Sequence, residues 1–227
     1  RLMELLDGIV KDSPSHPDVP RLELSVPVPE APIVVERRSD LEQAHVLIAT
    51  PIVAAPDPRR YAADLLANAL GGGTSSRLWQ KIREERGLAY SVGASTGMFN
   101  DCGFLAVSAA TSPDQVGEVT DIVIDEMRAV VREGISQDEL DLMKDQARAS
   151  ILLGLEDSAA RAATLAQFEM VHGRQISVEE TLANLEAVTT DDLHDVAREF
   201  FQTERVAYVA LGNLKKLDVP RERLRLD

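Results

Sequence analysis

The sequence predicts an α+β domain in which helices pack on one face of a mostly antiparallel sheet. Two observations carry this prediction. Segments of strand-like composition occur near the start, in the middle and at the end of the 227-residue chain, and blocks of helical pattern separate them. Strands and helices do not alternate one by one, which disfavours a doubly wound parallel sheet.

The predicted strands are rich in β-branched and apolar residues and are bounded by turn residues. Five segments fit this description: residues 33–38, 43–53, 89–99, 103–111 and 205–212. Asn100 and Asp101 form a short polar turn between the third and fourth segments. We therefore expect these two strands to pair as an antiparallel hairpin.

The first helices of the predicted domain lie on either side of a triple glycine. Asp57 and Pro58 are typical of a helix start, with Asp as the N-cap and Pro in the first turn. This helix should end at Gly71–Gly73. A second helix is expected over about residues 76–86, with Gly87 as a left-handed C-cap.

The later helices are marked by capping residues with an acidic or amide partner a few positions on. The expected pairs are Ser112 with Gln115, Ser136 with Glu139, Ser177 with Glu180, and Thr189 with Asp192. The long helical stretch after Ser136 should break near Asp157 and Ser158.

Domain boundaries follow from composition. Residues 1–10 show a helical apolar stripe, and six of the eleven prolines lie between Pro14 and Pro32, where they deny regular hydrogen bonding. We interpret residues 1–31 as the end of a preceding domain plus a Pro-rich linker, residues 32–218 as the main domain, and residues 219–227 as a tail. The chain opens on Arg1 within a helical pattern, so we expect a piece of a longer protein.

Composition excludes several classes of function. A net charge of −14 disfavours nucleic acid as a partner, although it is compatible with binding basic peptides or simply with a soluble surface. The apolar runs are too short to span a membrane, and no signal segment is visible. A single cysteine, Cys102, excludes an intrachain disulfide. Together these features predict a cytoplasmic protein.

The segment from Leu70 to Tyr90 carries the candidate site. Gly71–Gly73 precede a helix, but no Lys completes a phosphate-binding loop, and the preceding segment is helical rather than a strand. The glycines are as well explained by a sharp corner between two helices as by a role in substrate binding.

Arg83 and Tyr90 are the candidate catalytic residues. The turn at Gly87 can bring a residue from the last helical turn and one from the following strand to the same side. A Tyr hydroxyl can donate to an oxyanion, and Arg can bind a peptide carbonyl. Spacing alone also allows a solvated Arg83 and a Tyr90 at the edge of the core.

The histidines offer no zinc motif. Neither H-x-x-E-H nor its inverse is present, and Glu169 with His172 forms a lone E-x-x-H. We expect His45 to be a core residue of its strand, His172 to lie at a helix end and His194 to lie on a charged surface.

The segment LGGGTSSRLWQKIREERGLAYSV (residues 70–92) resembles the C-terminal half of the insulinase-type zinc metallopeptidases, which include pitrilysin and mitochondrial processing peptidase. The similarity extends over about residues 32–212 and includes the helical segment from Gly134 to Ala162.

The resemblance implies an enzyme of two homologous α+β halves that enclose a chamber. The N-terminal half would bind zinc, and the C-terminal half would contribute Arg83 and Tyr90. Gly71–Gly73, Ser75 and Ser76 correspond to a glycine-rich segment involved in substrate binding. Because the zinc motif is absent here, the chain alone should be inactive, with zinc held by the missing half.

Three arrangements remain open. The chain is the C-terminal half of a single-chain peptidase, a separate non-catalytic subunit with a zinc-bearing partner, or a peptide-binding scaffold of the same family. Its partners would be the zinc-binding half and a peptide substrate. If the face that meets the other half is uncovered, we expect the isolated chain to form a homodimer.

Overall fold

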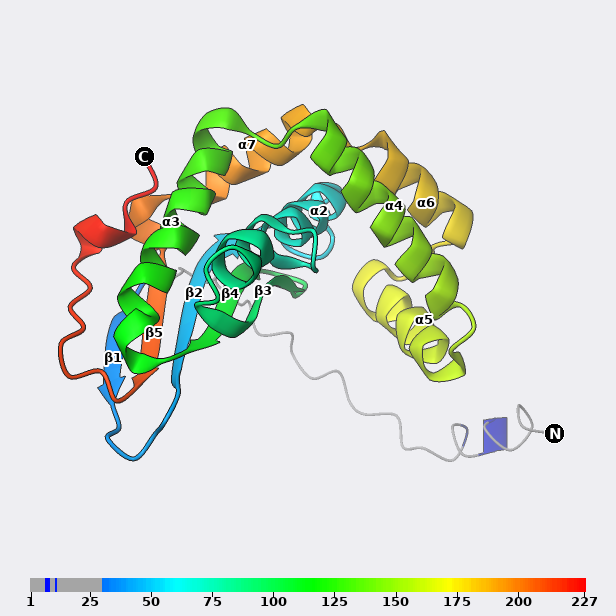
Figure 1. The fold of residues 1–227 in the computed structure, drawn as a ribbon. Coiled ribbons are helices and arrows are strands. Elements are labelled where there is room, and N and C mark those ends of the chain that lie inside the picture. The colour runs from blue at the N-terminus through cyan, green and yellow to red at the C-terminus, as the bar shows by residue number, and fades with distance from the viewer. Residues whose placement is uncertain (1–6, 9–10, 12–29) are drawn as a thin grey trace.

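The structure is a computed structural model that describes residues 7–8, 11 and 30–227 (Figure 1). Most of the predicted N-terminal helix and most of the predicted Pro-rich linker lie outside the described residues, as does His16.

A single five-stranded sheet organises the described part of the chain. Its strands are β1 (Ile33–Arg37), β2 (Ala44–Ile52), β3 (Ala89–Met98), β4 (Gly103–Thr111) and β5 (Ala207–Gly212). The spatial order is β1-β5-β2-β4-β3, and only the β1–β5 pair is parallel. The predicted α+β class, the antiparallel character and the hairpin between β3 and β4 are confirmed.

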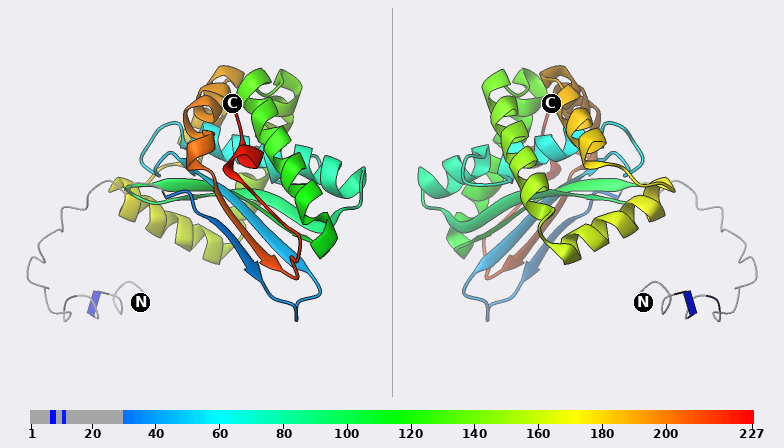
Figure 2. Two further views of the ribbon diagram at one scale, coloured as in Figure 1. Left: turned by 90° about the vertical axis from the view of Figure 1, so that its left-hand side faces the viewer. Right: turned by 90° about the vertical axis from the view of Figure 1, so that its right-hand side faces the viewer.

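Six helices follow the predicted pattern: α2 (Arg60–Gly71), α3 (Val116–Glu133), α4 (Gln137–Gly154), α5 (Ser158–His172), α6 (Val178–Ala187) and α7 (Thr190–Phe200). Figure 2 shows α2, α3 and α7 on one face of the sheet, with α4 leading away to α5 and α6. No helix among the described residues is both long and apolar enough to cross a bilayer.

The core lies between the sheet and the helices on its covered face. Ile48, Leu105 and Tyr208 of the sheet and Leu66 and Met127 of the helices are almost fully buried. In β2, buried and exposed residues alternate, as expected for a sheet with one open face. His45 falls on the open face and is exposed, so its predicted place in the core is wrong.

The predicted caps are mostly confirmed. Ser136 and Thr189 form reciprocal capping boxes with Glu139 and Asp192. Ser177 accepts a hydrogen bond from the Glu180 backbone, and Asp157 caps α5 after the expected break.

Two predicted helix starts are corrected. Asp57 is not the N-cap, because α2 begins three residues later at Arg60. Its carboxylate instead accepts the Arg59 backbone N–H at 2.8 Å and so closes a separate turn before the helix. Ser112 makes no capping bond to a backbone N–H; its hydroxyl donates to the Gln115 side chain at 2.5 Å, and the 3₁₀ turn over Pro113–Gln115 that follows leads directly into α3.

Residues 219–227 pack against the domain. Leu224 and Leu226 are fully buried in the core. Arg223 forms a salt bridge with Asp121 of α3 at 2.7 Å. Arg221 donates to the carbonyl of Ala31, shortly before β1, and to the carbonyl of Val206, just before β5. This C-terminal segment therefore contacts the chain where both parallel strands begin.

Candidate functional site

Arg83 lies in an irregular helical turn. The helix after the triple glycine starts at Arg77 and becomes π-helical over η1 (Trp79–Glu84). The Glu85 N–H donates to the Gln80 carbonyl at 2.9 Å, five residues back. Gly87 has φ +60°, which confirms the predicted left-handed end of the helix. Single π-turns within helices occur often at functional sites.

Tyr90 occupies a β-bulge at the start of β3. Ala89 pairs with Thr111 and Ser91 pairs with Ala110, so Tyr90 is an extra residue on its strand. The bulge breaks the alternation of β3, because Tyr90 and Ser91 are both exposed while Ala89 and Val92 are buried. Bulges of this kind re-aim a side chain. Tyr90 is 81% exposed, which leaves its hydroxyl accessible.

The two irregular elements bring Arg83 and Tyr90 together. The guanidinium carbon of Arg83 lies 4.6 Å from the centre of the Tyr90 ring and 4.2 Å from the centre of the Trp79 ring. An Arg83 N–H also donates to the Tyr90 carbonyl at 2.8 Å. The guanidinium therefore contacts two rings and holds the bulge in place. Cation–π contacts favour this arrangement.

This arrangement leaves donors free for a ligand. A guanidinium has five N–H donors, and a phenol has one O–H. The Arg83–Tyr90 pair therefore offers a planar cation and a hydroxyl donor side by side on an accessible surface. Such a pair can bind a peptide carbonyl or stabilise a developing oxyanion.

Trp79 was not identified from the sequence as part of this site. Its indole N–H donates to Glu84 at 2.9 Å, which orients the ring beneath the Arg83 guanidinium. Its position four residues before Arg83 on a helix is the signal that could have found it.

The triple glycine forms the predicted corner, and its members differ in role. A Cβ on Gly71 would come within 2.3 Å of the Ala94 backbone nitrogen in β3, so close packing of α2 on β3 requires glycine there. A Cβ on Gly73 would meet open space. Ser76 is buried and donates to the Gly73 carbonyl at 2.6 Å, whereas Ser75 is exposed. Gly72 lines a cavity.

Arg77 anchors the corner to α4. Its guanidinium donates to both carboxylate oxygens of Glu139, at 2.6 and 2.9 Å. The pKa of Glu139 is lowered to about 2, mainly by hydrogen bonds from the Arg77 guanidinium and to a smaller extent by hydrogen bonds from Ser136. A capping residue of α4 is therefore also one half of an ion pair that crosses the domain.

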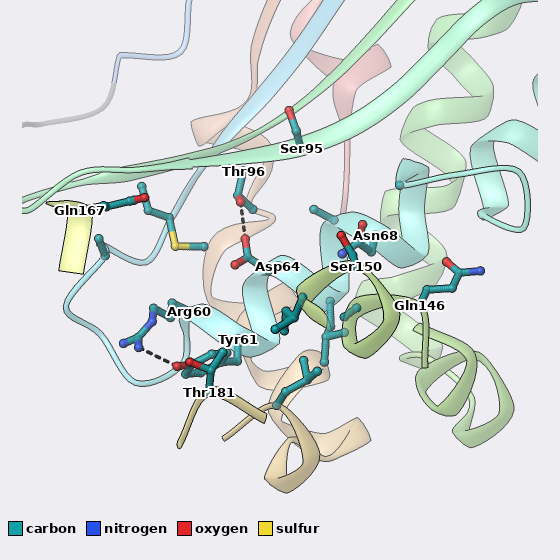
Figure 3. Close-up of a pocket in the computed structure, with 18 of the residues that line it drawn as sticks. Arg60, Tyr61, Asp64, Asn68, Ser95, Thr96, Gln146, Ser150, Gln167 and Thr181 are labelled. Carbon is teal, nitrogen blue, oxygen red and sulfur yellow. Dashed lines mark hydrogen bonds between the residues drawn. The ribbon is translucent and has the colours of Figure 1, made fainter. Parts of the chain in front are cut away.

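A cavity of about 690 Å³ lies between α2, β3 and the helices α4, α5 and α6 (Figure 3). Asp64 of α2 lines it and accepts a hydrogen bond from Thr96 of β3. Desolvation raises the pKa of Asp64, while the Thr96 hydroxyl and the nearby Arg60 act in the opposite direction. The sequence motifs did not reveal this cavity, because its walls come from five separate elements.

The described residues do not fit a metal centre. No group of three or more His, Cys, Asp or Glu side chains among them is arranged to bind a metal ion. His172 ends α5 as predicted, and desolvation lowers its pKa. His194 is half-buried with a ring nitrogen 2.9 Å from the Val131 carbonyl, so its predicted place on a charged surface is wrong.

Comparison with protein families agrees with this geometry. Residues 1–147 match the family model described as the peptidase M16 inactive domain. The chain belongs to the peptidase M16 family. The resemblance predicted from residues 70–92 is thereby confirmed for the family and for its non-zinc half.

Individual relatives support the same family assignment. An uncharacterized zinc protease of Streptomyces coelicolor is 39% identical over 215 residues, covering 94% of this chain and 46% of the relative. This M16 chain thus spans about half the length of that relative. A protease from Helicobacter pylori has the same fold, with a TM-score of 0.80 at 20% identity over 93% of this chain and 51% of its own.

A subunit of a large assembly also shares the fold. A chain of complex III₂ from Candida albicans superposes with a TM-score of 0.75 at 20% identity, covering 85% of this chain and 48% of that chain.

Proposed function

We propose that this M16 chain is the substrate-binding half of a zinc metallopeptidase that hydrolyses peptides, and that it is inactive alone. The single observation that carries the proposal is the stacked, accessible Arg83–Tyr90 pair, built by a π-turn and a β-bulge. The Streptomyces coelicolor relative, which is named a zinc protease and is about twice as long, supports it.

In this proposal Tyr90 donates its hydroxyl to the oxyanion that forms when the scissile carbonyl is attacked. Arg83 donates its free N–H groups to a carbonyl of the bound peptide. Trp79 holds the planar guanidinium against Tyr90, so both donors are positioned before the substrate arrives. Preorganised donors of this kind are effective because they need no reorganisation during the reaction.

Zinc has no place among the described residues of this chain, so no step of the proposal uses a metal held here. A zinc-binding half would have to supply it, either in the same polypeptide or as a partner subunit. Gly73 and Ser75, which are free of packing constraints on the corner, are the members of the predicted glycine segment best placed to contact a peptide.

The proposal is tested by reconstitution. Peptide hydrolysis should be undetectable with this chain alone and should appear when the zinc-binding half is present. The bound zinc should be traced to the other half by metal analysis of the separated parts. Zinc bound stoichiometrically by this chain alone, or hydrolysis without a second half, would contradict the proposal.

A second candidate is a non-catalytic scaffold, which the fold shared with a complex III₂ chain supports. The accessible face of the sheet, where Val34, Leu47 and Phe104 are each more than 40% exposed, is suited to covering by a protein partner. The same face supports the predicted homodimer of the isolated chain. Purification of the intact assembly distinguishes the scaffold from the peptidase half, because a scaffold would copurify without a zinc-bearing partner. The cytoplasmic location remains a prediction from the sequence.

A further inference from the structure

Asp64 stands out because its carboxylate faces a cavity without a cationic partner. Within the described part of the chain, its one hydrogen-bond donor is the neutral hydroxyl of Thr96. Among the described residues, no Lys, Arg or His forms a salt bridge with Asp64. A carboxylate has about four acceptor positions, so most of the acceptor capacity of Asp64 remains unused.

The nearest cation on the same helix is held elsewhere. Arg60, Asp64 and Asn68 recur every four residues and share one face of α2. The Arg60 guanidinium stacks on the Tyr61 ring, 4.4 Å from its centre, and donates to the Tyr61 hydroxyl at 2.8 Å. Figure 3 shows Asp64 directed at Thr96 while Arg60 lies against Tyr61. Arg60 lines the same cavity and its charge acts on Asp64, but its guanidinium is engaged with Tyr61 and forms no salt bridge with the Asp64 carboxylate.

The walls of the cavity are suited to an aliphatic stem. Met98 of β3, Ile151 of α4, and Phe168 and Val171 of α5 line it beside the polar groups. A volume of about 690 Å³ lies within the usual range for small-ligand sites, roughly 300–1,000 Å³. Arg60 and His172 also line the cavity, but Arg60 is engaged with Tyr61. An anion beside Asp64 would be repelled by its carboxylate inside a chain whose net charge is −14.

We propose that this cavity binds an alkylammonium group, with Asp64 as its counter-ion and the apolar walls around its methylene stem. The ammonium has three donors, which Asp64 and the side-chain oxygen of Asn68 can accept. The source is a free aliphatic amine or a lysine side chain of a bound peptide. The cavity does not include Arg83 or Tyr90 among its lining residues, so this site is separate from the proposed catalytic pair.

The test is a direct binding measurement on this chain, with no catalysis involved. By calorimetry, n-butylammonium is compared with n-butanol, and a blocked Ala-Lys-Ala peptide with the same peptide carrying norleucine. We expect the charged member of at least one pair to bind about tenfold more tightly. Preference for the amine alone assigns a free amine, and preference in the peptide pair, with or without the amine pair, assigns a peptide lysine. Equal binding within both pairs overturns the proposal.

Matched variants locate the site. Asp64→Asn preserves shape and can still accept the Thr96 hydroxyl, so the fold should persist while the preference falls to less than about twofold. Asp195→Asn removes an equal charge from an exposed position of α7 and should retain the preference. Retained preference in Asp64→Asn overturns the proposal.

A measurement on the unmodified chain does not depend on either variant. Backbone amide shifts during titration with the lysine peptide should concentrate at Asp64, Thr96 and Ser150, which line the cavity. Shifts confined to Tyr90 or to the open face of the sheet overturn the proposal. Because binding is measured without zinc, failure here is distinct from failure of the proposed peptidase function.

Discussion

The Arg83–Tyr90 pair and the Asp64 cavity are built in opposite ways. The pair rests on close-packed elements: Leu78, Ile82, Ala89 and Val92, its neighbours in sequence, are all buried. The cavity is partly walled by α5, a helix of 15 residues with no buried residue, in which Met170 is 79% exposed. Figure 1 shows α5 set apart from the sheet, beyond α4.

The difference teaches where rigidity lies in this domain. Donors that stabilise a short-lived charge must be held in place beforehand, and a packed π-turn and bulge do so. A helix that buries little surface can open at low cost in free energy, because local stability follows burial. We expect hydrogen exchange to be fast in α5 and slow at the β3 amides that pair with β4.

The largest expected effect is on turnover, when the hydroxyl of Tyr90 is removed from the packed region. Tyr90→Phe in the complete enzyme should lower kcat by ~10²–10³, the usual cost of removing one oxyanion donor. Zinc content should not change, since the phenol binds no metal. Steady-state kinetics and metal analysis measure both. Wild-type turnover in Tyr90→Phe would end the catalytic assignment.

A smaller loss is expected when the charge of Arg83 is kept but its shape is changed. Arg83→Lys retains a cation but loses the planar stack between Trp79 and Tyr90. We expect kcat/KM to fall by roughly tenfold or more. Arg86→Lys, in a half-exposed salt bridge with Glu118, should have little effect on kinetics. Wild-type kcat/KM in Arg83→Lys would show that the charge alone is sufficient, and equal losses in the two variants would show that the loss is not specific to Arg83.

Close packing of α2 on β3 at the glycine corner can be tested by comparing two glycines. Gly71→Ala forces a Cβ against the Ala94 backbone and should lower the free energy of unfolding by about 1–3 kcal/mol. Gly73→Ala enters open space and should change it by less than about 0.5 kcal/mol. Urea denaturation of both variants measures the difference. Similar free energies would mean that α2 can move away from β3 without cost.

The smallest effect concerns pH and the anchor between the corner and α4. The Arg77 guanidinium lowers the pKa of Glu139 from its ordinary 4.5 to about 2. Folding therefore favours the ionised form, so this stabilisation is complete above pH 4.5 and is lost as pH falls towards 2. About a third of the Glu139 side chain is exposed, so after screening we expect on the order of 1 kcal/mol.

Glu139→Gln should remove this part of the acid sensitivity. The free energy of unfolding of the variant should lie closer to that of the wild type at pH 3 than at pH 7. Glu118→Gln, in the half-exposed pair with Arg86, is the control and should show a smaller difference at both pH values. A constant gap between wild type and Glu139→Gln across this range would rule out the coupling to Arg77.

Local signals predicted most of the secondary structure. Ser136 and Thr189 marked helix starts because their side chains satisfy the first free N–H groups. Gly87 marked a helix end because its φ is positive. The prediction of Asp57 as an N-cap was wrong, because the same carboxylate can close a turn before a helix as well as cap the helix itself.

The site was only half accessible to this reasoning. The sequence suggested Arg83 and Tyr90 as a pair, and the structure places them in contact. The bulge at Tyr90 depends on the register with β4, which the residues of β3 do not indicate. His45 was misplaced because which face of β2 is covered depends on where α3 and α7 pack. The Asp64 cavity was missed because its walls come from elements far apart in the chain.

By itself, the sequence determined the order of elements, most helix ends, the family resemblance and the absence of the zinc-binding motif, because these depend on short-range chemistry and on residue identity. Only the tertiary structure decided that Arg83 lies between two rings, that residues 219–227 enter the core and that Asp64 faces a cavity. These features depend on which surfaces meet, and contacts between distant segments have no local signature along the chain.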